Sequence, residues 1–129
     1  MVAAGCGGGS SSGSDTCDDG DGALSDVAFV LVTSPQSGER VSSGFTVTGC
    51  SRTFESNVPW KLLDSSGTEL ASGATMGGGA DGPGPFSFTV TYTTSERQIA
   101  ALEVSEEDVS GGEGARKPVR NVVPLVLRP

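Results

Sequence analysis

The chain has 129 residues, which is room for one domain of ordinary size, and a formal net charge of −8. It contains no histidine, so the commonest general base and the commonest metal ligand are both missing. We therefore expect no enzyme, no cofactor and no metal site. An acidic chain with no basic patch also argues against nucleic acid and against electrostatic docking on anionic lipid.

Residues 1–26 are predicted to form a tail that does not fold. Small residues precede Cys6, and a Gly/Ser run over residues 7–14 follows it. This arrangement resembles a bacterial lipobox with its tether, which implies diacylation of the Cys6 thiol and a lipid anchor in the cell membrane. The alternative is a chance cysteine in a low-complexity leader.

Only five residues precede Cys6, whereas a signal peptide needs a charged region and an apolar stretch. We expect either a misplaced start or a trimmed chain, with the mature protein extracytoplasmic. The tail holds five Asp and no Lys or Arg. A calcium loop beginning at Asp15 would have Cys17 at its third position and Asp26, not Glu, at its twelfth. A solvated acidic linker is the preferred interpretation.

From residue 27 onward the pattern is that of β-structure. Short apolar or alternating runs separated by Gly, Pro, Ser and Asp predict seven strands and no helix. They cover residues 28–32, 45–51, 58–64, 69–72, 86–92, 101–105 and 121–127, with a long glycine-rich loop over 77–85. Pro124 lies inside the last run, which indicates an edge position or a bulge.

Strands at intervals of about ten residues are typical of a sandwich or a barrel. We predict an immunoglobulin-like β-sandwich of about seven strands over residues 27–129. The apolar faces predict the following core residues: Phe29, Val47, Trp60, Leu62, Phe86, Phe88, Val90 and Leu102.

The segment from Thr53 to Val58, Thr-Phe-Glu-Ser-Asn-Val, resembles the immunoglobulin-like domain of bacterial spore germination proteins. Further matches are residues 34–38, 47–49, 63–67, 86–88 and 122–127, so the resemblance covers about residues 28–127. It implies an extracytoplasmic module that often occurs in lipoproteins and has no catalytic residues.

Glu55 and Asn57 are the candidate binding surface, because they are polar and lie in the most specific segment of the resemblance. The alternative is a structural corner, in which Glu55 accepts backbone N–H groups and Asn57 occupies a turn conformation. Trp60 is expected in the core rather than as an exposed binding anchor.

Cys17 and Cys50 could pair in an oxidising compartment. Against the disulfide, Cys17 lies in the predicted tail and Cys50 is expected to face inward, which favours a buried free thiol. The acidic run Glu106, Glu107 and Asp108 could bind a cation or act as acid and base, but a solvated loop is preferred.

The leading hypothesis is a non-catalytic, membrane-anchored lipoprotein whose domain binds an envelope protein or a cell-wall component. A role in germination is one form of it. The alternative is a passive structural or assembly subunit of an envelope complex, and a carboxylate-dependent envelope enzyme is a distant third.

Overall fold

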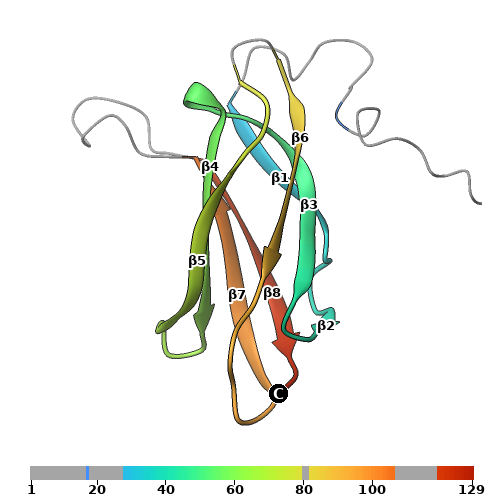
Figure 1. Ribbon diagram of the computed structural model, residues 1–129, viewed down its shortest axis with the longest axis vertical. Coiled ribbons are helices and arrows are strands. Elements are labelled where there is room, and N and C mark those ends of the chain that lie inside the picture. The colour runs from blue at the N-terminus through green and yellow to red at the C-terminus, as the bar shows by residue number, and fades with distance from the viewer. Residues whose placement is uncertain (1–16, 18–27, 80–81, 107–118) are drawn as a thin grey trace, which may run out of the picture.

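Two sheets face each other in the computed structural model, which describes residues 17, 28–79, 82–106 and 119–129 (Figure 1). The smaller sheet has the order β1-β3-β6 and the larger β2-β8-β7-β4-β5, and all pairs are antiparallel except β2 with β8. The strands are β1 (Phe29–Ser34), β2 (Arg40–Val41), β3 (Phe45–Arg52), β4 (Asn57–Asp64), β5 (Glu69–Met76), β6 (Gly84–Val90), β7 (Gln98–Ser105) and β8 (Arg120–Leu127), with a 3-10 turn at Phe54–Ser56.

Alternation along each strand fills the space between the sheets. Because successive side chains point to opposite faces, buried or half-buried residues alternate with more exposed ones along β6, β7 and β8. In β3, Gly49, Cys50 and Ser51 are buried in succession. The predicted all-β sandwich is thereby confirmed. No helix among the described residues is long and apolar enough to cross a membrane.

The core contains five of the eight predicted residues, namely Val47, Leu62, Phe86, Val90 and Leu102. Trp60 and Phe88 are half-buried and pack against it. The prediction for Phe29 is wrong, because Val30 and Val32 are the β1 residues that pack against the core. Because β1 is short and apolar at consecutive positions, the sequence does not show which of its two faces points to the core.

The strand count also differs from the prediction. The two-residue β2 is too short to show a period, and β7 begins at Gln98 instead of residue 101. Pro124 lies in the middle of β8, which pairs with β7 along its whole length. The Pro124 carbonyl accepts the Gly38 N–H at 2.7 Å, on the side of β8 away from β7. The proline nitrogen faces that side too, so the ladder with β7 loses no hydrogen bond.

Tyr92 joins three segments at one end of the sandwich. Its hydroxyl lies 2.7 Å from the carbonyl oxygen of Arg128 and 3.0 Å from that of Val41, and it accepts the Arg128 N–H at 3.2 Å. The Tyr92 N–H is donated to the Ser43 hydroxyl at 2.9 Å. The side chain therefore fixes the ends of β2 and β8 to the chain that leaves β6.

Replacing Tyr92 by Phe should lower the free energy of unfolding by about 1–2 kcal/mol, because carbonyl groups at this buried site lose their donor. Urea unfolding of the variant measures the loss. Thr89→Val, an exposed change on β6, should alter stability by less than about 0.5 kcal/mol. Equal stability of Tyr92→Phe and the parent would contradict the role given to the hydroxyl.

Asp64 orders the turn between β4 and β5. Its carboxylate accepts the Ser66 hydroxyl at 2.8 Å and the N–H groups of Ser66 and Thr68 at 2.9 Å each. The Ser66 hydroxyl bond, followed by the backbone bonds, holds the pKa of Asp64 below its ordinary value of 3.8.

Asp64→Asn removes the charge but keeps an acceptor oxygen. Since the folded pKa is the lower one, the carboxylate stabilises the fold above its unfolded pKa and loses this effect as pH falls through the folded pKa. The difference in urea midpoint between parent and variant should therefore be present near neutral pH and shrink below 3.8. Ser65→Ala, on the same turn, should show no such trend, and a difference that grows on acidification would refute the assignment.

Candidate functional site

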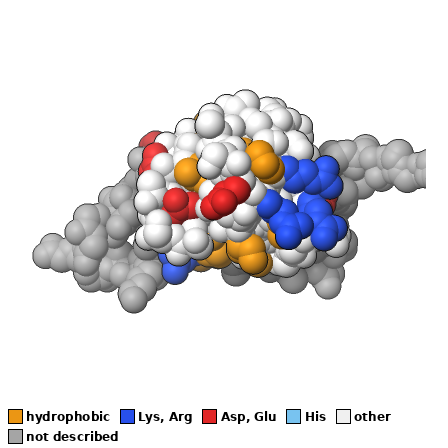
Figure 2. Space-filling model, turned by 90° about the horizontal axis from the view of Figure 1, so that it is seen from below, with side chains coloured by type: hydrophobic (Ala, Val, Ile, Leu, Met, Phe, Trp, Pro, Cys, Tyr) orange, Lys and Arg blue, Asp and Glu red, His pale blue; other side chains and the backbone are white. Residues whose placement is uncertain are grey.

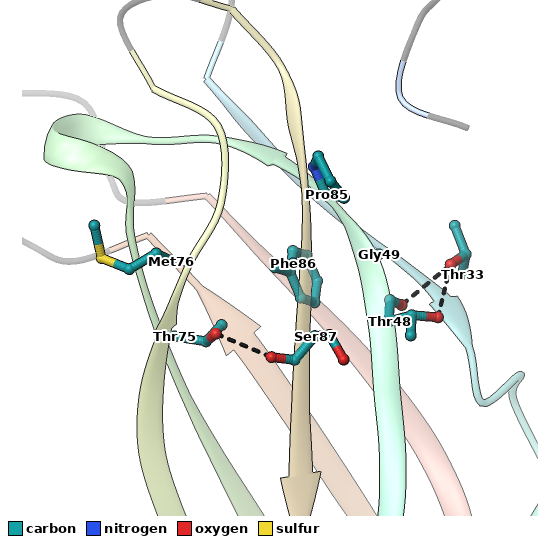
Figure 3. Close-up of a pocket in the computed structure, with 8 residues that line it drawn as sticks. All are labelled: Thr33, Thr48, Gly49, Thr75, Met76, Pro85, Phe86 and Ser87. Atoms are coloured by element: carbon teal, nitrogen blue, oxygen red, sulfur yellow. Dashed lines mark hydrogen bonds between the residues drawn. The ribbon is translucent and has the colours of Figure 1, made fainter. Parts of the chain in front are cut away.

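A groove of about 610 Å³ crosses the outer side of the smaller sheet and reaches the neighbouring edge of β5 (Figure 3). Because Val47 and Phe88 on β3 and β6 point inward, their neighbours Thr48 and Ser87 point outward and line the groove. A bulge after Val32 adds Thr33 to this surface. The lining residues are Thr33, Thr48, Gly49, Thr75, Met76, Pro85, Phe86 and Ser87.

Hydroxyl groups hold both ends of the groove. The Thr33 hydroxyl is donated to the Thr48 carbonyl at 3.1 Å, and the two threonine hydroxyls lie 3.3 Å apart. At the other end, the Thr75 hydroxyl is donated to the Ser87 carbonyl at 3.1 Å, which links β5 of one sheet to β6 of the other. These bonds fix the positions of the two walls (Figure 3).

The floor of the groove depends on a glycine. A side chain at Gly49 would overlap the Leu31 carbonyl and the ring of Phe86, which is 3% exposed. The ring therefore lies against the backbone of β3. Met76, 61% exposed, adds apolar surface on the β5 side. None of the lining residues titrates near neutral pH, so the groove is suited to binding rather than to proton transfer.

The sequence-predicted surface residues lie outside this lining. Glu55 is exposed, and it adopts φ 53° in the 3-10 turn, next to Ser56 at φ 63°. The expectation that Asn57 takes the turn conformation is wrong, since Asn57 is the first residue of β4 and pairs with Met76. Asn57 thus flanks the groove, whereas Glu55 occupies the structural corner that precedes it.

Cys17 and Cys50 form a disulfide. Cys50 pairs with Leu31 and Pro85, which point outward, so the expectation that it faces inward is wrong. It is nevertheless 2% exposed. The bond to Cys17 therefore attaches the N-terminal part of the chain to the outer side of the smaller sheet, and Cys50 is not a free thiol in the structure.

Trp60 lies between the sheets as expected. Its ring stacks on Phe88 at 4.7 Å between centroids with an angle of 8°, and Gly73 on β5 leaves room for it. A Cβ at Gly73 would come within 2.8 Å of the indole.

The acidic run is described only at Glu106, while Glu107 and Asp108 lie outside the described residues, as does Cys6. Glu106 is 6% exposed, and its carboxylate accepts the Val119 N–H at 3.3 Å. It closes the base of the connection between β7 and β8. Within the part of the chain that the structure describes, no three His, Cys, Asp or Glu residues are grouped to hold a metal.

Sequence reasoning missed the groove. Its threonines and serine look like ordinary solvent-facing residues of amphipathic strands, and its two walls come from strands that are neighbours only in three dimensions. No local signal marks them.

Comparison with known proteins confirms the resemblance. Residues 29–113 match the model of a family described as the immunoglobulin-like domain of bacterial spore germination, so the last strand lies outside the match. The crystal structure of CopC from Methylosinus trichosporium OB3b has a TM-score of 0.49 and 18% identity, covering 80% of this chain and 95% of that one. A search of the curated proteins finds no match.

The positive φ at Glu55 leads to a prediction that tests whether this residue has a structural role. Glu55→Val should lower the free energy of unfolding by about 1–2 kcal/mol, because a β-branched residue is strained at positive φ. Glu55→Gly should be more stable than Glu55→Val by a similar amount, because glycine adopts positive φ without strain. Urea unfolding measures both free energies. Equal stability of the two variants would show that the backbone is not left-handed there in solution.

Proposed function

Because the chain belongs to the family of immunoglobulin-like domains of bacterial spore germination, we propose that it is a lipid-anchored envelope module that binds a protein or cell-wall partner in the groove across β1, β3, β6 and β5. Membership of the family indicates an extracytoplasmic binding or structural domain and favours a non-catalytic one. The lipid anchor on Cys6, the partner and a link to germination are parts of the proposal.

The disulfide supports the compartment and the tether. Bonds of this kind persist in oxidising compartments outside the cytosol. Cys17 follows Cys6 by eleven residues and is bonded to Cys50, on the side of the sandwich that carries the groove. An anchor at Cys6 would therefore hold this face of the domain within a short length of chain from the membrane.

The groove is the observation that carries the proposed binding activity. Its volume lies in the range of about 300–1,000 Å³ that is usual for ligand sites. The exposed Met76 and Pro85 offer apolar contact, and the hydroxyls of Thr48 and Ser87 offer hydrogen bonds. Its walls are held by hydrogen bonds before any partner arrives, which reduces the entropy lost on binding.

The test compares two arginine substitutions on the outward face of the same strand. Thr48→Arg fills the groove, whereas Thr46→Arg places the same charge two residues away, outside the lining. A photo-crosslinking group at residue 76 in the full chain would first identify the partner in envelope extracts. Binding to that purified partner should then weaken at least tenfold in Thr48→Arg and less than about twofold in Thr46→Arg.

Equal binding by both variants would refute the groove as the site. A chain that cross-links only to its own copies would favour the alternative of an assembly subunit. Thermal unfolding of both variants shows whether each retains the fold.

A further inference from the structure

One end of the sandwich carries three arginines that are far apart in the sequence, namely Arg40, Arg97 and Arg128. Figure 2 looks at this end, where β2 and the C-terminus lie, and shows basic side chains together on one side and acidic ones beside them. All three arginines are exposed. The expectation of a chain with no basic patch is therefore wrong, although the chain as a whole is acidic.

Strand pairing explains the cluster. Arg40 on β2 pairs with Val126, and Ile99 on β7 pairs with the same residue from the other side. These positions point away from the core, because their neighbours Val41, Ala100, Leu125 and Leu127 are buried. Arg97 and Arg128 lie two residues beyond Ile99 and Val126 in their chains, at the same end of this face.

These arginines form no ion pair within the described residues. The ion pair at this sheet joins Arg120 and Glu103 at 3.7 Å, towards the opposite end of β8. The nearby Glu39 carboxylate accepts the Gln36 N–H at 2.9 Å. Three exposed guanidinium groups are thus left available on a surface that also contains Ile99, which is 61% exposed.

We propose that this arginine cluster, Arg40, Arg97 and Arg128, binds a polyanion that carries phosphate or carboxylate groups. Guanidinium groups bind both kinds of oxyanion through paired hydrogen bonds, and several of them together favour a polymer over a single ion. The overall net charge of −8 repels polyanions, so a localised cluster is needed for binding at all.

The position of the cluster fits this role. It lies on the larger sheet, at the end where β3 begins, whereas Cys50 lies near the end of β3 and on the smaller sheet. If the domain is held through Cys17, which rests on the proposed function, the cluster points away from the anchor. It would then meet an anionic polymer of the envelope rather than the lipid surface.

The test measures binding of the full-length chain to polyphosphate and to poly-L-glutamate by titration at two salt concentrations. By analogy with flexible nucleic acid strands, three charge contacts predict an affinity that falls about 20-fold between 50 and 200 mM salt. The double variant Arg97→Gln/Arg128→Gln should bind the polymer at least tenfold more weakly at 50 mM salt. Its affinity should also depend much less on the salt concentration.

The matched control is Lys61→Gln/Arg120→Gln, which removes two positive charges from the same sheet outside the cluster and should retain affinity within about twofold. Thermal unfolding verifies the fold of each variant, and the backbone bonds of Arg128 to Tyr92 survive its substitution. Binding to one polymer but not the other distinguishes a phosphate from a carboxylate ligand.

Three results would overturn the proposal. The first is no binding to either polymer at 50 mM salt. The second is an equal loss of affinity in the control variant Lys61→Gln/Arg120→Gln. The third is an equal loss of affinity in Ile99→Thr, which would indicate an apolar contact of the kind made with a protein. None of these outcomes depends on the groove, so the proposed function and this inference fail separately.

Discussion

Burial of the inward side chains of both sheets is the interaction on which the rest of this structure depends. Neither sheet can cover its own apolar face, and each buried Leu or Val contributes about 1.5–3 kcal/mol when it leaves water. Leu62 and Leu102 from the larger sheet belong to the same core as Val47 and Val90 from the smaller one. The stack of Trp60 on Phe88 adds an aromatic contact between β4 and β6.

With the inward faces committed to the core, the outward faces are free to carry function. The smaller sheet presents a groove of hydroxyl and apolar groups, and its Cys50 receives the bond from Cys17. The larger sheet presents the arginine cluster at the end where β8 finishes, beside β2. The two surfaces differ in chemistry and lie on different sheets, so one domain has room for two partners.

Much of the fold was predictable because alternation is a local signal. The strands β3 and β6 are predicted by a period of two over seven or eight residues, and β8 by a continuous apolar run. The phase of that period is a different matter where a run is short or apolar on both faces. The wrong prediction for Phe29 has this cause. The wrong prediction for Cys50 has another: the period of β3 puts Cys50 on the face opposite Val47, and the disulfide rather than the core buries it there.

The residues alone determined an all-β domain and its immunoglobulin-like family, since composition, turn spacing and the segment around Glu55 are properties of contiguous chain. The order of strands in the sheets is not such a property. It brought Thr33 and Thr48 near Thr75, bonded Cys17 to Cys50, and gathered Arg40, Arg97 and Arg128 on one face. Pairing between distant segments is determined by the burial of the whole core, so the groove and the arginine cluster became visible only once the chain was folded.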